Sequence, residues 1–521
     1  MDEYWTIRQA AEALQVHERT VRRWIAAGRL ATVRVARTIR VPRPAVERLA
    51  LESLRAPRQE APGVLQAQEP WGAEQEPQSP EVATMPGEDL EHGSGAGPVQ
   101  IDSTQAGESG AGECRPGDSG KRATKMSETK ADVVIQRGLK DVIAGESSIC
   151  FIDGQKGRLM YCGFDVADLA TYSTFEEVAY LLWYGRLPGK IEFEAFLDSF
   201  TGSVELPVET VMILRMFPRA ATPMEVLRTA VSSLGHWDPD SGCTRLDAVL
   251  RKAIRLTARI PLLVTAHQRL RFGAEPIHPL PGKSIAYNFL YTLHGTEPDP
   301  TWVRAFDVAL ILHADHEWNA STFAARVIAS TMADMYSGVT GAIGALKGPL
   351  HGGANEQVMK MLDEIGDPSK AEAWVKGALA KKVKIPGFGH RVYRTEDPRA
   401  TILRRYAEAL AKEAGEERLY ETAREVERVV RENTKVYPNV DFYSGICYRV
   451  MKIEPELFTP IFAISRVVGW TAHILEQWGN NRIIRPRAHY TGADDLEYIP
   501  LDQRGKTWAH EDAELDREPD V

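Results

Sequence analysis

Apolar residues recur every three to four positions through most of the chain after residue 170, which is the spacing of one face of an α-helix. This periodicity predicts consecutive helices at Val208–Phe217, Pro223–Leu234, Leu246–Leu270, Ala286–Leu293 and Trp302–Leu312. Short β-prone runs occur in residues 140–161, where Asp153-Gly154 and Gly157 break them. The pattern predicts a mostly α fold in which a little β-structure precedes the helices.

Helix boundaries can be placed in two further segments. Ser173-Thr174-Phe175-Glu176 has the sequence of a capping box, so we expect a helix to begin there with Ser173 as its N-cap. An apolar segment from Phe323 to Leu346 predicts one helix, which Gly348-Pro349 ends. The next helix is marked by the apolar positions Val358, Met359 and Leu362.

Residues 1–55 show a different pattern. Apolar spacing marks one short amphipathic helix around residues 7–14 and a second around residues 21–25, which Gly28 ends. Thr32–Val41 then alternates apolar residues with arginines, which is typical of a two-stranded wing. The string TIRQAAEALQVHERTVRRWIAAGRL resembles the small winged helix-turn-helix of the MerR and excisionase type, and the resemblance covers about 50 residues.

Charge supports a nucleic-acid partner for this region alone. Residues 1–55 carry eleven Arg against six Asp plus Glu, whereas the whole chain has a formal net charge of -9. The second predicted helix turns Arg19, Arg22 and Arg23 outward, and Arg37 lies in the wing, so these side chains can meet phosphates and base edges. We predict that residues 1–55 bind DNA; the alternative is an ordinary solvated face rich in arginine.

Residues 56–130 are dominated by Pro, Gly, Glu, Gln and Ser. Residues 56–120 contain twelve acidic residues and only two basic ones, Arg58 and Arg115. Such a stretch cannot bury enough apolar surface to order itself. We therefore predict a disordered acidic linker, with a partner-binding segment as the alternative.

The cysteine content and the hydropathy bound the protein class. Five scattered cysteines without a CxxC motif fit a reduced compartment and give no cysteine metal site. No run of 18 apolar residues occurs, and the N-terminus lacks an apolar signal core. We expect a cytoplasmic protein without a membrane partner.

His351 is the first candidate for chemistry, because it lies just before a predicted helix in the segment Gly348-Pro349-Leu350-His351-Gly352-Gly353-Ala354-Asn355. The neighbouring glycines let a ligand approach the backbone. The positive end of the helix dipole disfavours an imidazolium ion. We therefore expect His351 to be neutral and to donate one hydrogen bond.

Two further segments carry related chemistry. Lys384–Arg394 runs through a Gly-rich turn to His390, which lies beside two arginines, and Asp397-Pro398-Arg399 follows. Tyr437–Gly445 places Asp441 in an apolar, aromatic setting, where desolvation should make the carboxylate a better base. One carboxylate, two histidines and several arginines suit abstraction of a proton next to a carbonyl, followed by attack on an anionic carbonyl substrate.

The segments GPLHGGAN, PGFGHRVYRTEDPR and PNVDFYSG, in this order, resemble the citrate synthase family, including its 2-methylcitrate synthases, over about residues 134–510. The resemblance implies a helical fold with a large and a small domain, in which the synthase occupies residues 131–515 and the small domain about 355–455. It implies an enzyme that condenses acetyl-CoA with oxaloacetate and water. We expect no cofactor, because the coenzyme A thioester is itself a substrate.

The resemblance also implies roles for single residues. The catalytic residues would be His351, His390 and Asp441. Oxaloacetate would be bound by His316, Arg399, Arg466 and Arg485, with Arg485 supplied by the second subunit of a homodimer. Coenzyme A would be bound by Pro386, Gly387, Phe388, Gly389 and Arg394.

Alternatives remain open at this point. His313 and His316 lie at i, i+3, but no third ligand is suitably spaced, so we expect no metal. A 2-methylcitrate synthase differs by one methyl group of the acyl substrate, which a pocket discriminates by only about 1–3 kcal/mol. The third alternative is a DNA-binding transcriptional regulator that uses the synthase domain as a metabolite sensor.

Overall fold

The computed structural model describes residues 135–139, 142–493, 495–496 and 498–504 in full, and the backbone of three short strands within residues 1–42. The chain divides into two units, Met1–Ser127 and Glu128–Val521. Several predictions lie outside the described residues and stay predictions: the two N-terminal helices, the DNA-binding side chains Arg19, Arg22, Arg23 and Arg37, the linker 56–130, and residues 505–515.

The described strands of the first unit are antiparallel. β2 (Val33–Val35) pairs with β3 (Thr38–Pro42), and Val33 lies opposite Arg40. β1 (Tyr4–Trp5) pairs with the other edge of β3, giving the order β1-β3-β2. The predicted two-stranded wing is confirmed. β1 was not predicted, because a strand of two residues is too short to show a period.

The second unit begins its regular structure with a small antiparallel sheet. Its strands are β4 (Cys150–Asp153), β5 (Arg158–Tyr161) and β6 (Phe164–Asp165), in that spatial order. Leu159 and Tyr161 are two residues apart and therefore lie on the same face of β5, and neither has any exposed surface. One face of the sheet is therefore packed against the helices.

Helices dominate the described residues that follow. They are α4 (Val166–Tyr172), α5 (Phe175–Tyr184), α6 (Lys190–Thr201), α7 (Val208–Met216), α8 (Pro223–Leu234), α9 (Leu246–Arg271), α10 (Ile285–His294), α11 (Pro300–His313), α12 (Ala320–Ser330), α13 (Met335–Leu346), α14 (Ala354–Ile365), α15 (Pro368–Ala380), α16 (Pro398–Ala414), α17 (Glu417–Asn433), α18 (Val440–Val450) and α19 (Phe458–Gly479). Single 3-10 turns occur at η1 (Arg137–Leu139), η2 (Gly235–Trp237), η3 (Pro455–Leu457) and η4 (Leu501–Gln503). The mostly α prediction is confirmed, and the predicted helices between residues 208 and 312 correspond to α7–α11.

The predicted capping box at the start of α5 is wrong by one residue. Thr174, not Ser173, is the N-cap, and its side chain accepts a hydrogen bond from the backbone N–H of Glu177. Glu176 is buried instead, and its carboxylate accepts a hydrogen bond from the backbone N–H of Ile285 at the start of α10. A tertiary contact, which a local motif cannot report, therefore takes Glu176 away from the cap.

The single helix predicted over Phe323–Leu346 is also wrong, because the chain breaks it into α12 and α13. Met332 has a φ of 65° in the turn between them. Asp334 then caps α13 by accepting a hydrogen bond from the backbone N–H of Ser337. Apolar residues on both sides and the lack of Gly or Pro in the turn hide this break from the periodicity.

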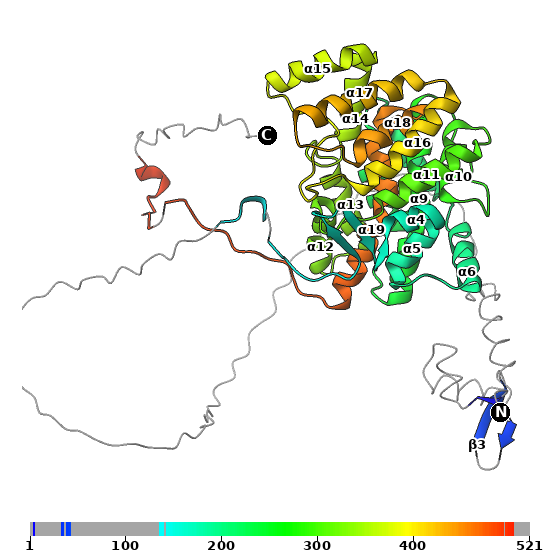
Figure 1. Cartoon of the computed structure of the whole chain (residues 1–521). Coiled ribbons are helices and arrows are strands. Elements are labelled where there is room, and N and C mark those ends of the chain that lie inside the picture. Colours follow the sequence, from blue (N-terminus) through cyan, green and yellow to red (C-terminus); the bar gives the residue numbers. More distant parts are fainter. Residues whose placement is uncertain are drawn as a thin grey trace, which may run out of the picture. The chain divides into compact units, whose positions relative to one another are not determined.

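α19 is the central helix of the second unit. It contacts α5, α8, α9, α11, α12, α13 and α14, and Trp470 in its middle has no exposed surface. Residues Pro455–Gly479 are long and apolar enough to cross a membrane by composition, but their most apolar window is wholly buried among other helices. Figure 1 shows α14–α18 gathered at one end of this unit. α11 contacts α16, α18 and α19 alike, so the segment after α11 begins where these helices meet.

Candidate active site

His351 lies in the turn between α13 and α14, and Gly353 caps α14. Its Nε2 lies 3.2 Å from the backbone nitrogen and 2.9 Å from the hydroxyl oxygen of Ser321. A backbone N–H can only donate, so Nε2 accepts and the proton of the neutral ring is on Nδ1. Burial, together with the positive charge of Arg466, lowers the pKa of His351 to about 4. The imidazole is therefore a neutral donor through Nδ1–H, as we expected from the sequence.

His390 has the opposite tautomer. Its Nδ1 accepts hydrogen bonds from the backbone N–H groups of Val392 at 3.0 Å and Tyr393 at 3.2 Å. The proton of the neutral ring must therefore be on Nε2. Burial and the charge of Arg399 lower the pKa of His390 to about 4. His390 can therefore donate a hydrogen bond through its Nε2–H group.

His316 lies beside His390 in a cluster of three rings. The ring centroids of His316 and His390 are 5.0 Å apart, and those of His390 and Tyr393 are 4.7 Å apart. The Nε2 atom of His316 lies 3.3 Å from the hydroxyl of Tyr393. Burial, followed by the charges of Arg399 and the neighbouring histidine, lowers the pKa of His316 well below its ordinary value. His316 is therefore an uncharged imidazole that lies beside the uncharged imidazole of His390.

Asp441 lies in the first turn of α18, and its backbone N–H donates to the side chain of the N-cap Asn439. Its Oδ1 atom is buried and has no hydrogen-bond partner among the described residues. Burial raises the pKa of Asp441 to about 6, although the charge of Arg399 acts in the opposite direction. A carboxylate that is poorly solvated in this way is a stronger base than an exposed one.

The loop Pro386–Gly389 ties the segment of His390 to that of Asp441. Gly387 and Gly389 have φ values of 78° and 84°, and a Cβ at Gly387 would lie 2.7 Å from the side chains of Phe442 and Val358. The backbone N–H of Gly389 donates to Tyr437, and that of Asn439 donates to Gly387, each at 2.9 Å. The two glycines therefore allow a close backbone pairing that fixes one candidate residue relative to the other.

Arg399 and Arg466 are buried guanidinium groups, with 2% and 1% exposure. Arg399 forms a bidentate pair with Asp397, at 3.0 and 2.8 Å. Arg466 donates from Nε to the carbonyl of His313 at 2.7 Å, and its Nη2 is buried without a partner among the described residues. Both charges influence the pKa of His316 and of Asp441, so the two arginines lie near these groups. The arrangement suits a ligand with more than one carboxylate.

The structure therefore brings six predicted site residues together: His316, His351, His390, Arg399, Asp441 and Arg466. Arg485 is exposed in the segment after α19 and does not join this group in its own chain. Arg394 is also exposed, while its backbone N–H donates to the carbonyl of Gly154. The prediction that Arg485 serves a partner subunit stays a prediction.

Sequence reasoning missed two residues that set the geometry of this site. Ser321 fixes the tautomer of His351 from a position 30 residues away, and nothing in its local sequence indicates this. Tyr393 lies within the PGFGHRVY segment, so an aromatic residue near His390 was visible, but its contact with His316 was not. Over residues 142–493, no three His, Cys, Asp or Glu side chains converge as metal ligands. A cavity of about 220 Å³ near α6 and α9 contains none of the candidate residues.

This chain is similar to known proteins in both of its parts. A family described as "Citrate synthase, C-terminal domain" matches residues 138–487, and a "Helix-turn-helix domain" family matches residues 4–53. Citrate synthase 2 of Bacillus subtilis is 50% identical over 369 residues, which cover 71% of this chain and 99% of that protein. The 2-methylcitrate synthase of Shewanella oneidensis is 42% identical over 372 residues, covering 70% and 97%.

Solved structures agree with the sequence comparison. The crystal structure of citrate synthase from Pyrobaculum aerophilum superposes with a TM-score of 0.67 at 46% identity, covering 71% of this chain and 95% of that one. Citrate synthase from Thermotoga maritima gives a TM-score of 0.65 at 42% identity, covering 72% and 100%. The chain belongs to the citrate synthase family of enzymes, and it carries a helix-turn-helix domain at its N-terminal end.

Proposed function

We propose that this chain condenses acetyl-CoA with oxaloacetate and water, and releases citrate and coenzyme A. One observation carries the proposal: the desolvated Asp441, whose Oδ1 has no partner among the described residues, and two neutral histidines of opposite tautomer are grouped around the charges of Arg399 and Arg466. A base for a carbon acid and two uncharged hydrogen-bond donors are the groups that an enolate-forming condensation needs.

In the proposed mechanism, Asp441 takes a proton from the methyl group of the acetyl thioester. The Nδ1–H of His351 donates a hydrogen bond to the thioester oxygen as negative charge develops on it. The Nε2–H of His390 donates to the ketone oxygen of oxaloacetate, whose carbon the enolate attacks to form the new carbon–carbon bond. The ketone oxygen takes up a proton, and water then cleaves the citryl thioester to citrate and coenzyme A.

The other predicted residues bind the substrates in this proposal. Arg399, Arg466 and His316 hold the carboxylates of oxaloacetate, and the partner subunit's Arg485 completes the set in a homodimer. A guanidinium fork matches a carboxylate, and burial strengthens each such contact. The loop Pro386–Gly389 holds the adenine of coenzyme A, and the exposed Arg394 meets one of its phosphates.

The function is tested by measuring coenzyme A release from the purified protein with oxaloacetate and either acetyl-CoA or propionyl-CoA. We expect the higher kcat/KM with acetyl-CoA, by a ratio of about 10–200, because one methyl group is discriminated only weakly. A preference for propionyl-CoA would assign 2-methylcitrate synthesis instead. If no small acyl-CoA releases coenzyme A, the metabolite-sensor alternative replaces the enzymatic one.

In the same assay, Asp441→Asn and His351→Ala are each expected to lower kcat by about 10²–10⁴-fold while the far-UV circular dichroism is unchanged. Asp363→Asn is a matched control, because this carboxylate is 52% exposed on α14 and lies outside the site. Near-normal turnover by Asp441→Asn would remove this residue as the base.

The wild-type kcat/KM should decline below about pH 6, where Asp441 becomes protonated and can no longer accept a proton.

The homodimer with a shared site is tested by complementation. Chains carrying Arg485→Ala and chains carrying Asp441→Asn should each be inactive alone. Mixed heterodimers should recover part of the activity, because one of their two sites would contain both wild-type groups. If verified heterodimers stay inactive, Arg485 acts within its own chain or outside the site.

We also propose DNA binding by residues 1–55 as a second function. It is supported by the helix-turn-helix match over residues 4–53 and by the eleven arginines of this region. One small module should bind weakly and mostly through phosphates. A homodimer would bring two modules to one DNA molecule and raise the avidity through effective concentration.

Binding to paired DNA sites should vary gently with the distance between them. A flexible linker of about 75 residues has a root-mean-square reach of roughly 45–50 Å, so it cannot impose one half-site spacing. Mobility-shift titrations should also show steep weakening with salt and a loss of affinity in Arg22→Ala/Arg23→Ala. A sharp preference for one helical-turn spacing would mean that the modules dimerise directly. Absence of binding at low salt would leave residues 1–55 with a protein-interaction role.

A further inference from the structure

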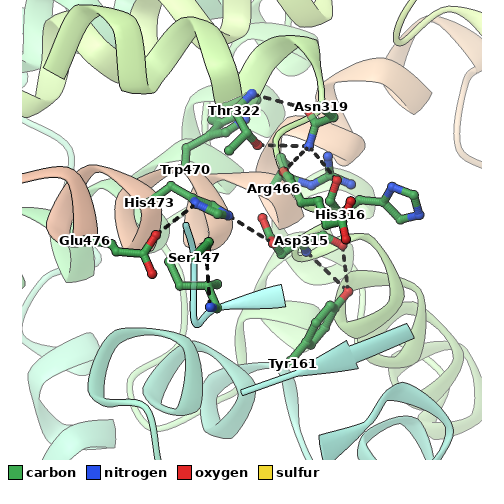
Figure 2. A network of polar contacts seen from close by, with 12 residues as sticks. Ser147, Tyr161, Asp315, His316, Asn319, Thr322, Arg466, Trp470, His473 and Glu476 are labelled. Carbon is green, nitrogen blue, oxygen red and sulfur yellow. Dashed lines mark hydrogen bonds and ion pairs between the residues drawn. The ribbon is translucent and has the colours of Figure 1, made fainter. Parts of the chain in front are cut away.

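Arg466, the proposed substrate contact, shares one face of α19 with other side chains that form polar contacts. Trp470, His473 and Glu476 follow Arg466 at intervals of four, three and three residues, so the four side chains lie along one side of the helix. Figure 2 shows Glu476, His473 and Asp315 in one line that leads to His316 and Arg466. The sequence pointed to Arg466 alone.

His473 has no exposed surface and joins two buried groups. Its Nε2 lies 3.1 Å from Oδ2 of Asp315, and its Nδ1 lies 3.0 Å from Nη1 of Arg326. A guanidinium can only donate, so Nδ1 accepts and Nε2 carries the proton that is donated to Asp315. His473 therefore holds a carboxylate on one side and a guanidinium on the other, with a fixed tautomer.

The inner end of this chain of contacts reaches the proposed oxaloacetate site. Asp315 directly precedes His316, and its backbone N–H and carbonyl both bond the hydroxyl of Tyr161, at 3.2 and 3.0 Å. The second carboxylate oxygen of Asp315, Oδ1, is buried and has no partner among the residues that the structure describes, and the same holds for Nη2 of Arg466. The structure describes both side chains in full, and no ion pair joins the Asp315 carboxylate to the Arg466 guanidinium. A Cβ on Gly469 would lie 2.4 Å from Asp315 Oδ1, so the carboxylate occupies space that this glycine leaves free.

The outer end reaches the start of the second unit. Arg326 donates to Glu476 at 2.7 Å and lies 4.1 Å above the ring of Trp318. Glu476 in turn accepts hydrogen bonds from the backbone N–H of Ser148 at 2.8 Å and from its hydroxyl at 3.2 Å. Charges of alternating sign therefore run from Asp315 through Arg326 to Glu476, with His473 between the first two.

We propose that Asp315 and His473 are positioning residues for oxaloacetate binding, and that His473 holds the Asp315 carboxylate away from Arg466. This inference rests on the proposed assignment of Arg466 and His316 to oxaloacetate. Without the hydrogen bond from His473, two buried guanidinium groups attract the Asp315 carboxylate, those of Arg326 and Arg466. Arg326 already has Glu476 as its counter-ion, whereas Arg466 has no carboxylate partner among the described residues, so Arg466 is the stronger competitor for Asp315. An internal ion pair would then compete with the substrate carboxylate for the same guanidinium, because buried charges pair wherever they can.

The test compares His473→Phe with His473→Gln in steady-state assays on the full-length protein. Phe keeps the ring volume and removes both hydrogen bonds, whereas the Gln amide retains one donor and one acceptor. We expect His473→Phe to raise the KM for oxaloacetate by about tenfold or more, which corresponds to one lost charge-assisted contact. The kcat and the KM for acetyl-CoA should change less than about threefold, a difference below 1 kcal/mol. His473→Gln should restore most of the oxaloacetate affinity.

Thr471→Val is the matched structural control. Thr471 is buried on α19 and accepts a hydrogen bond from the indole of Trp183, outside the chain of contacts around His473. It should lower the unfolding temperature without changing the KM for oxaloacetate. Glu476→Ala, at the half-buried outer end, should raise that KM by about threefold because Arg326 loses its counter-ion. This second variant decides the matter if His473→Phe does not fold.

An unchanged oxaloacetate KM in the folded His473→Phe variant, or in Glu476→Ala where His473→Phe does not fold, would overturn the proposal. So would equal loss of affinity in Thr471→Val, because the effect would then report general destabilisation. Inactivity of the wild-type protein with every acyl-CoA would instead count against the proposed function. In that case the same variants are compared by calorimetric titration with oxaloacetate alone, and equal dissociation constants for wild type and His473→Phe would overturn the positioning role.

Discussion

Two guanidinium groups, those of Arg399 and Arg466, are buried in the second unit, and the described residues give a carboxylate partner to only one of them. Arg399 forms a bidentate pair with Asp397, whereas Arg466 donates to a carbonyl, and its Nη2 has no partner within the described part of the chain. Leaving such a group unpaired costs several kcal/mol of folding free energy. The rest of the site follows from this constraint, because an anionic ligand can satisfy the Arg466 guanidinium and the described part of the fold does not.

The same positive charge organises the chemistry around it. With burial, it disfavours protonation of His316, His351 and His390, so these rings remain neutral donors or acceptors. Backbone N–H groups and Ser321 then select one tautomer at His351 and the other at His390. Asp441 stays a competent base because burial outweighs the stabilising field of Arg399. One buried field and a few fixed hydrogen bonds thus give each group a different role.

Sequence reasoning reached the parts of the molecule that are encoded locally. Helical periodicity located α7–α11, and the three short motifs contained most of the residues that the structure brings together. It failed where partners are far apart along the chain. The burial of Glu176 against α10, the Ser321 contact to His351 and the contact between Asp315 and His473 each join positions separated by 30 residues or more. The break at Met332 was missed for a different reason, because no Gly or Pro marks that turn.

The central claim is that Arg399 and Arg466 are held ready for a ligand with two carboxylates. Thermal unfolding of the purified protein in rising concentrations of oxaloacetate or pyruvate tests it without depending on turnover. Oxaloacetate should raise the unfolding temperature progressively, since a ligand at one hundred times its Kd stabilises the folded state by about 2.7 kcal/mol. Pyruvate, which lacks the second carboxylate, should raise it far less, and Arg466→Met should abolish most of the oxaloacetate effect. Equal shifts with the two ligands, or a full oxaloacetate shift in Arg466→Met, would contradict the account.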